Sequence, residues 1–328
     1  MRILLAFLIS LAVTIIMGFL FIPVLRRLKA GQSIKRDGPV WHLSKEGTPT
    51  MGGILFIAGI LCAVLLAGIP ALRAGDHSAL SMLAFSLIQG AIGFFDDYMK
   101  VRHHKNEGLK GTQKFLLQLA VAVAFILLLR YLGFLSPNLY VPFLDVTVPL
   151  PEALYVVFAA FVILGTVNAV NLTDGVDGLV SGVTLPVALC FCALAAVWGK
   201  SGQSLFAAAL AAGLLGFLFF NFHPAKVFMG DTGSLFLGGA VCALAFSLDM
   251  PLVLVPLGIV YICEAMSDII QVVYFKLSRG KRVFKMAPIH HHFEKCGWSE
   301  VKVFAVFSGV SLLFALLTFL GVRGRYGL

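Results

Sequence analysis

The sequence predicts an all-α integral membrane protein with about ten transmembrane helices. Of its 328 residues, 59% are hydrophobic and 12% are charged, whereas soluble domains carry about 25% charged residues. The mean hydropathy is +0.96. The apolar residues gather in runs of roughly 20, the length of a helix that crosses a bilayer core about 30 Å thick. These observations exclude a soluble globular enzyme, a disordered chain and a small disulfide scaffold.

The apolar runs predict the spans in order along the chain. They are 3–25, 51–72, 79–95, 115–134, 153–171, 179–198, 204–222, 234–248, 251–275 and 303–322. The first run is too long for a signal-peptide core and has no clear cleavage site, so we expect a retained helix. We expect a single polytopic membrane domain over 1–328, with polar loops at 26–50, 96–114, 172–178, 223–233 and 276–302.

The basic residues predict the orientation in the membrane. Nineteen of the 25 lysines and arginines fall in loops that follow odd-numbered spans, and five fall on the other side. The positive-inside rule therefore places the odd loops in the cytoplasm and both termini outside. Topology and anionic lipid headgroups explain the formal charge of +9 better than a nucleic-acid partner does. The six cysteines form no CxxC pair, and we interpret them as buried small hydrophobes.

The polar clusters of the chain fall almost entirely in the five cytoplasmic loops. This distribution predicts one active-site cleft at that membrane face. Asp96 and Asp97 end the third span, where two adjacent carboxylates repel each other and oppose the helix dipole. The two adjacent carboxylates would be stabilised if they bound a divalent metal or if one of them accepted a proton as a base. The alternative is a solvated helix end.

A second cluster repeats a polar residue at every third position. Asn168, Asn171, Asp174 and Asp177 follow this spacing, so adjacent members can share a helix face. Four polar residues at a membrane edge are costly without a partner, which favours a binding site over a capped turn.

The third cluster is a turn in which Gly230 and Gly233 flank Asp231 and Thr232. A carboxylate on such a turn suits Mg²⁺, which takes one or two carboxylates together with phosphate oxygens and water. We expect Thr232 or Ser234 to cap the following helix, whose N-terminus favours phosphate. The alternative is a cap with no ligand.

The remaining polar residues suggest contacts with phosphate and with a base. His290, His291 and His292 point about 100° apart on a helix, so they predict phosphate contact by one or two rings and no shared metal. The segment 47–53, with the Thr50 hydroxyl, can bind phosphate through backbone N–H groups, and Phe228 can stack on a base. Candidate phosphate-binding lysines are Lys45, Lys100, Lys110 and Lys114, although each also serves as a topology determinant. Glu264, Asp268 and Gln271 form one polar stripe inside the ninth span, which can either pack against the polar site or reach down to it.

Together these motifs resemble the polyprenyl-phosphate N-acetylhexosamine-1-phosphate transferases over essentially the whole chain. The matching motifs are Gly-Thr-Pro-Thr-Met-Gly-Gly at 47–53, Asp96-Asp97, Asn171-Leu172-Thr173-Asp174-Gly175, Gly230-Asp231-Thr232-Gly233-Ser234 and Pro288-Ile289-His290-His291-His292-Phe293-Glu294. The run of histidines is similar to that of the branch whose donor carries a muramoyl-pentapeptide.

The resemblance implies the substrates, the cofactor and residue roles. The donor would be UDP-N-acetylmuramoyl-pentapeptide, the acceptor undecaprenyl phosphate, and the products lipid I and UMP, in the bacterial cytoplasmic membrane. Mg²⁺ would bind Asp231, Asp96 would be the base, and Asp97 would belong to the same catalytic centre. Homodimers are expected. The resemblance places Asn171, Asp174, Asp177, Asn221 and His291 in the cleft, and Gly175, Phe228, Met229 and Gln271 in the uridine pocket.

Three alternatives stay open at this point. A related enzyme would transfer N-acetylglucosamine-1-phosphate to undecaprenyl phosphate. A secondary transporter would place its polar residues near the bilayer midplane, whereas these gather at one face. An intramembrane metalloprotease is disfavoured because the chain has no HExxH motif.

Overall fold

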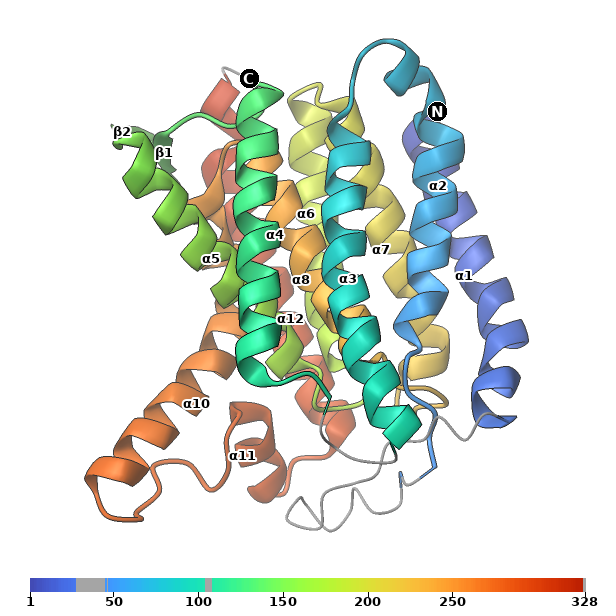
Figure 1. The fold of residues 1–328 in the computed structure, drawn as a ribbon, viewed down its shortest axis with the longest axis vertical. Helices are drawn as coiled ribbons and strands as arrows, with labels where there is room; N and C mark the ends of the chain where they lie inside the picture. Colours follow the sequence, from blue (N-terminus) through green and yellow to red (C-terminus); the bar gives the residue numbers. More distant parts are fainter. Residues whose placement is uncertain (28–44, 46, 104–107, 327–328) are drawn as a thin grey trace.

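The computed structural model describes residues 1–27, 45, 47–103 and 108–326, and it is a bundle of long helices (Figure 1). The long helices are α1 Arg2–Arg27, α2 Gly53–Arg73, α3 Ser78–His103, α4 Gly111–Tyr131, α5 Glu152–Thr173, α6 Leu179–Val197, α7 Ser201–Asn221, α8 Gly230–Ser247, α10 Ile259–Leu277 and α12 Glu300–Val322. Shorter elements are β1 Asn138–Val141, β2 Val146–Pro149, η2 Pro251–Val253, α9 Leu254–Leu257, α11 Ile289–Lys295 and η3 Arg323–Tyr326.

Within the described residues, nine helices are long and apolar enough to cross a membrane. The expected ninth span is broken: Pro251–Leu257 and Ile259–Leu277 meet at an angle of 81°. The break coincides with Pro256 and Gly258, the residue types at which helices kink. Figure 1 shows α10 leaning away from the bundle, with α11 beside it at the end opposite the β1–β2 hairpin. The prediction of about ten spans is confirmed when this bent pair is taken as one.

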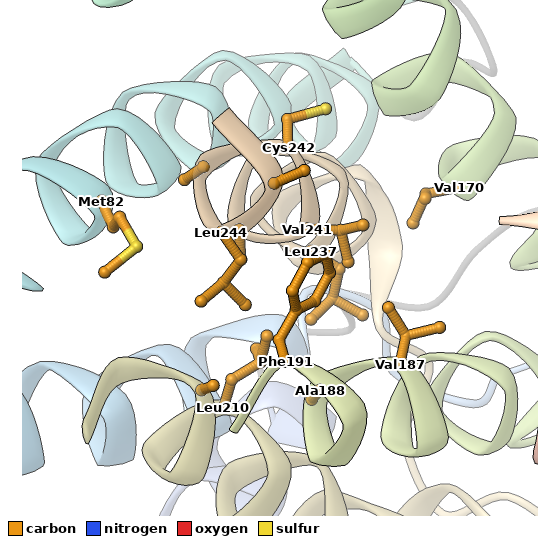
Figure 2. Packing of buried hydrophobic residues seen from close by; sticks show 14 of the residues in the cluster. Met82, Val170, Val187, Ala188, Phe191, Leu210, Leu237, Val241, Cys242 and Leu244 are labelled. Carbon is orange, nitrogen blue, oxygen red and sulfur yellow. The ribbon is translucent and has the colours of Figure 1, made fainter. Parts of the chain in front are cut away.

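Helix α8 forms the centre of the bundle. Every residue from Thr232 to Ser247 is buried. Figure 2 shows Leu237, Val241 and Leu244 of α8 packed toward Phe191 of α6 and Leu210 of α7, with Met82 of α3 on another side. Because α8 has protein neighbours all around, its polar N-terminus is held rigidly relative to the surrounding helices.

Small residues bring α3 against the start of α8. A Cβ atom added at Gly93 would collide with the backbone carbonyl of Asp231, and one at Gly90 would lie 3.1 Å from the Phe236 Cβ. Such close approach is the usual function of glycine between membrane helices. Gly90, Gly93 and Asp97 share one face of α3, so this contact carries Asp97 to the α8 N-terminus.

Two local predictions differ from the structure, and one connection contains strands that the sequence did not predict. Helix α3 runs to His103, so Asp96, Asp97 and Lys100 lie on a helix and not in the expected loop 96–114. The loop 276–302 contains helix α11. An antiparallel hairpin, β1–β2, fills the connection between α4 and α5, which the hydropathy scan left unassigned. Most of the expected loop 26–50 lies outside the described residues.

Candidate active site

The candidate active site is built around Asp96 and Asp97 of α3 and Asp231 of α8. One carboxylate oxygen from each of the three lies within 4.8 Å of the other two. Asp96 and Asp97 are buried, and Asp231 is partly exposed. The expected meeting of these distant acids is therefore confirmed, and we call Asp96, Asp97 and Asp231 the acidic centre.

Asp97 is bound by the N-terminus of α8. Its Oδ1 accepts a hydrogen bond from the Asp231 N–H at 3.2 Å, and its Oδ2 accepts from the Thr232 N–H at 2.8 Å and the Thr232 hydroxyl at 2.7 Å. The expected cap by Thr232 or Ser234 is wrong, because the first turn of α8 receives its acceptor from α3. A carboxylate at a helix N-terminus is also favoured by the helix dipole.

Asp231 is surrounded by positive charge and an amide. Its Oδ2 pairs with the ammonium groups of Lys100 at 3.0 Å and Lys114 at 2.8 Å, and its Oδ1 accepts from the Asn171 amide at 2.9 Å. Lys100 also reaches Asp96, at 2.5 Å. The cluster thus combines three carboxylates with two lysines, a composition suited to a metal ion and a phosphate group together.

Asp174 lies just past the end of α5, and its carboxyl has no hydrogen-bond or ion-pair partner among the described residues. Burial raises the pKa of its carboxyl well above the ordinary 3.8, and the negative charges of Asp231, Asp97 and Asp177 raise this pKa further. Asn168, at the start of the same series, is placed elsewhere, because its amide donates to Gln118 of α4 at 3.0 Å.

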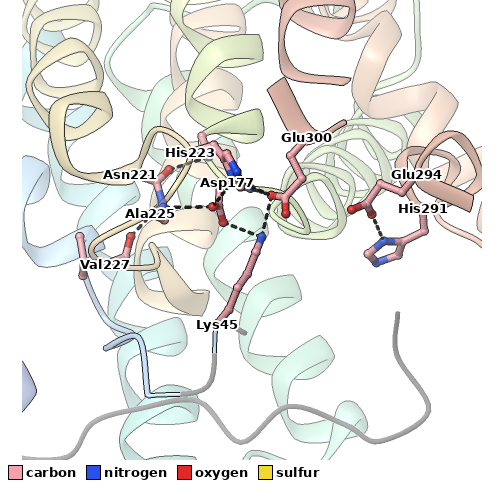
Figure 3. Close-up of polar contacts among 10 residues, drawn as sticks. Lys45, Asp177, Asn221, His223, Ala225, Val227, His291, Glu294 and Glu300 are labelled. Atoms are coloured by element: carbon pink, nitrogen blue, oxygen red, sulfur yellow. Dashed lines mark hydrogen bonds and ion pairs between the residues drawn. The ribbon is translucent and has the colours of Figure 1, made fainter. Parts of the chain in front are cut away.

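A second polar cluster joins four segments of chain (Figure 3). Lys45 donates to Asp177 at 2.8 Å and to Glu300 at 2.6 Å. Asp177 also contacts the His223 ring at 3.0 Å and accepts from the Ala225 N–H at 3.0 Å. Lys45 therefore has its charge balanced by two carboxylates, and Asp177 is fully satisfied. We call Lys45, Asp177, His223 and Glu300 the lysine cluster.

Asn221 connects the loops around the lysine cluster. Its Oδ1 accepts from the Gly178 N–H at 3.1 Å, and its Nδ2 donates to the Val227 carbonyl at 2.9 Å. Gly178 adopts a left-handed conformation with φ of +73°, which favours glycine. The buried Asn221 amide consequently orders both the 174–178 turn and the 223–229 loop.

The segment before α2 pairs with the segment before α8. The Phe228 N–H donates to the Pro49 carbonyl at 2.8 Å, and the Gly53 N–H donates to the Met229 carbonyl at 2.9 Å. Met229 is fully buried, whereas Phe228 is partly exposed. A Cβ atom at Gly230 would lie 2.8 Å from the Thr50 hydroxyl oxygen and 2.6 Å from Asp97 Oδ2. Thr50 therefore borders the acidic centre.

The three histidines have different surroundings. His290 is wholly buried and binds Glu264 of α10 at 3.0 Å. His291 binds Glu294 at 2.7 Å and is partly exposed, and Figure 3 shows the two side chains pointing toward each other. His292 accepts from the Lys285 N–H at 3.1 Å.

Gln271 of α10 binds the loop that follows its own helix. Its Oε1 accepts from the Val283 and Phe284 N–H groups, and its Nε2 donates to the Phe284 carbonyl at 2.9 Å. Glu264 and Gln271 of the predicted polar stripe thus contact the 283–290 segment. Asp268 between them has no partner among the residues that the structure describes.

The sequence reasoning missed Glu300 and His223 as members of the site. The only signal for Glu300 is an acidic residue that follows the helix-capping Ser299. His223 stands out only as a polar residue between Phe222 and Pro224. Their pairing with Asp177 and Lys45 depends on contacts between α12, the 174–178 turn and the 223–229 loop, which no local pattern encodes.

The chain matches known proteins in sequence. The family model described as glycosyl transferase family 4 matches residues 79–249. A phospho-N-acetylmuramoyl-pentapeptide-transferase signature matches residues 45–57, the segment that contains Lys45 and Thr50.

The curated relatives that match nearly the full chain share one name. The phospho-N-acetylmuramoyl-pentapeptide-transferase of Clostridium acetobutylicum is 47% identical over 315 residues, covering 96% of this chain and 97% of the relative. The protein of the same name from Desulforamulus reducens is 47% identical over 319 residues, covering 96% and 94%. That of Acetivibrio thermocellus is 45% identical over 324 residues, covering 98% and 95%.

Proposed function

The chain belongs to the phospho-N-acetylmuramoyl-pentapeptide-transferase family, and we propose that it transfers phospho-N-acetylmuramoyl-pentapeptide from its UDP-linked donor to undecaprenyl phosphate. The products are lipid I and UMP, and the step belongs to peptidoglycan synthesis. The chain is thus a phosphotransferase in a bacterial membrane. The N-acetylglucosamine-1-phosphate alternative is not favoured, because the relatives carry the muramoyl-pentapeptide name.

The observation that carries this proposal is the meeting of the acidic centre with Lys100 and Lys114. The reaction brings a lipid phosphate against a diphosphate, which crowds negative charge at the reacting phosphorus. Lysines held at fixed positions stabilise that charge without reorganising during the reaction. The two lysines reach Asp231 from different helices, α3 and α4, so the site can hold phosphate groups from two sides.

The residues of the acidic centre fit a Mg²⁺ ion. Mg²⁺ prefers oxygen ligands and binds through one or two carboxylates together with substrate phosphates. Because Asp97 is buried and bound by the N-terminus of α8, whereas Asp231 is partly exposed, we assign the direct ligand role to Asp231, with Asp96 beside it. When bound, the ion supplies charge neutralisation for the diphosphate.

The chain's own side chains perform the other parts of the reaction. Asp96 accepts the proton of the acceptor phosphate, whose oxygen then attacks the phosphorus that carries the sugar. The bond from this phosphorus to the bridging oxygen breaks, and UMP leaves. Lys100 and Lys114 hold the phosphates, while Asn171 keeps Asp231 oriented.

The remaining predicted residues form the walls of the substrate site in this proposal. Thr50, Asp174 and Asn221 border the diphosphate region, together with Lys45 and Asp177 of the lysine cluster. Gly175 and Phe228 contact the uridine, whereas the fully buried Met229 acts by holding this loop against the start of α2 through its carbonyl. Gln271 acts through the loop it binds. His291 contacts phosphate, while His290 and His292 hold the segment in place. The site faces the cytoplasm, both termini lie outside, and two copies form a homodimer.

A transfer assay on the purified full chain tests the function and the metal. We expect labelled muramoyl-pentapeptide to enter an organic-extractable lipid, UMP to be released, and EDTA to abolish both. Asp231→Asn should lower kcat by at least about 10²-fold, the size of effect typical of losing one preorganised charge contact. Glu152→Gln, at an exposed ion pair on the far side of the bundle, is the control.

The same assay separates the alternatives. UDP-N-acetylglucosamine should not replace the donor. Activity that survives both EDTA and Asp231→Asn would contradict the metal assignment, and absence of lipid product from the wild-type chain would contradict the function.

A further inference from the structure

One pair of buried ionisable side chains, Glu264 and His290, lies outside the acidic centre. Both side chains are fully buried, and Glu264 Oε2 lies 3.0 Å from His290 Nδ1. The same oxygen accepts from the His290 backbone N–H at 3.4 Å. A carboxylate that binds Nδ1 fixes both the tautomer and the orientation of the ring. Nδ1 therefore carries the hydrogen, and Nε2 is the free end of a fixed ring.

The free end of the His290 ring faces the turn that follows Asp174. His290 Nε2 is buried without a hydrogen-bond partner in the described structure. A Cβ atom added at Gly175 would collide with the His290 ring. The backbone of the 174–178 turn therefore rests directly on a ring whose orientation Glu264 determines.

Helix α11 depends on such contacts for its position. It has seven residues, and an isolated helix of that length is not stable in water. Glu264 binds at its first turn, where backbone N–H groups lack partners. The His291 ring follows directly, with its centroid 4.1 Å from that of His290. A change in the orientation of His290 is thus transmitted both to His291 and to the turn beside Asp174.

We propose that Glu264 is a positioning residue for the transfer reaction: through His290 it sets the separation between His291 on α11 and the 174–178 turn. The inference rests on the proposed function for its catalytic consequence. Glu264 contacts neither substrate nor the acidic centre in this assignment. Its hydrogen-bond acceptance, rather than its negative charge, is the property that the reaction needs.

Two substitutions at Glu264 test which property is required. Glu264→Gln keeps an acceptor for Nδ1–H, so it should retain kcat within about threefold. Glu264→Leu removes the acceptor and should lower kcat by about 10²-fold, the cost of a small misplacement near reacting groups. KM for the donor should change little, because binding in the ground state is kept. Asp268→Asn, one turn along α10 and without a partner among the described residues, is the matched control and should keep wild-type kcat.

A double-mutant cycle tests whether the effect passes through His290. If it does, Glu264→Leu combined with His290→Asn should lose no more activity than His290→Asn alone. Additive losses would overturn the inference. A Glu264→Gln variant whose kcat is as low as that of His290→Asn would also overturn the inference. This comparison remains available if Glu264→Leu does not fold.

Hydrogen exchange across residues 289–295 gives a readout independent of turnover. Exchange should be at least about tenfold faster in Glu264→Leu than in the wild type and unchanged in Glu264→Gln. Unchanged exchange in the leucine variant would overturn the positioning role. An inactive wild-type chain with the expected exchange pattern would instead contradict the proposed function alone.

Discussion

At the scale of single residues, the acids of the site are all aspartates but have different partners. Asp97 is satisfied by the N-terminus of α8, Asp231 by two lysines and an amide, and Asp177 by Lys45 and His223. Asp174 alone among these acids has no partner in the described structure. The residue types predicted a polar site correctly, but they did not distinguish a helix cap from a metal ligand, because both functions use a carboxylate.

The unpartnered carboxyl of Asp174 predicts a pH-dependent stability. Burial and neighbouring negative charges raise its pKa in the folded chain, so the folded state binds this proton more tightly than the unfolded state. The resulting stabilisation is complete below the ordinary pKa of 3.8 and is lost as the pH rises through the raised value. Asp174→Asn should therefore raise the unfolding temperature at pH 8 by about 2 °C or more.

Thermal unfolding in EDTA, from pH 8 downward, measures this difference. The gain from Asp174→Asn should shrink as the pH falls, while its transferase activity should drop. Asp177→Asn serves as the contrast, because it removes the negative charge of the ion pair with Lys45 and should lower the unfolding temperature. An Asp174→Asn variant less stable than the wild type at pH 8 would contradict the assignment.

At the scale of elements, the contact of α3 with α8 builds the acidic centre. Gly90 and Gly93 allow the two helices to approach, and Asp97 then accepts the first N–H groups of α8. The sequence predicted both helices and the polar residues at their ends. It did not predict that α3 continues to His103, since hydropathy falls at Asp96 although the helix does not end there.

Because Asp97 caps α8, two substitutions that both replace it with an uncharged side chain should differ in stability. Asp97→Asn keeps an oxygen acceptor, whereas Asp97→Ala keeps none, and both remove the charge. The alanine variant should be less stable than the asparagine variant by about 1 kcal/mol, the usual value of an N-cap. Thermal unfolding of the two variants at one pH gives this difference directly. Equal unfolding temperatures would show that Asp97 does not cap α8.

At the scale of the whole molecule, the polar ends of several helices meet at one end of the bundle. The start of α1 and the β1–β2 hairpin lie at the other end (Figure 1). A reaction between a lipid phosphate and a soluble nucleotide sugar requires such a site at the bilayer edge. We propose on the basis of the positive-inside rule that the site end is cytoplasmic.

Cysteine accessibility tests this orientation. Contrary to the expectation that the cysteines are buried, Cys296 just past the end of α11 is exposed. A membrane-impermeant maleimide should therefore label it in inside-out vesicles only. A Leu144→Cys variant places a thiol on the hairpin, where Leu144 is exposed, and it should be labelled in intact spheroplasts. Labelling of Cys296 from outside the cell would reverse the topology.

The sequence by itself determined the membrane class, the approximate spans, the side on which polar residues gather and the residue types of the site. Hydropathy, the number of charges and the spacing of residues are local or additive properties. They can therefore be read from the sequence without knowing which segments meet in the fold. Only the tertiary structure decided which carboxylate pairs with which cation. Asp177 meets Glu300 and Lys45 across more than 100 residues of chain, and Glu264 of α10, which follows the bend at Gly258, meets His290 of α11. Such contacts depend on how whole helices pack. Glycine and proline positions influence that packing, but they do not identify in advance which side chains will meet.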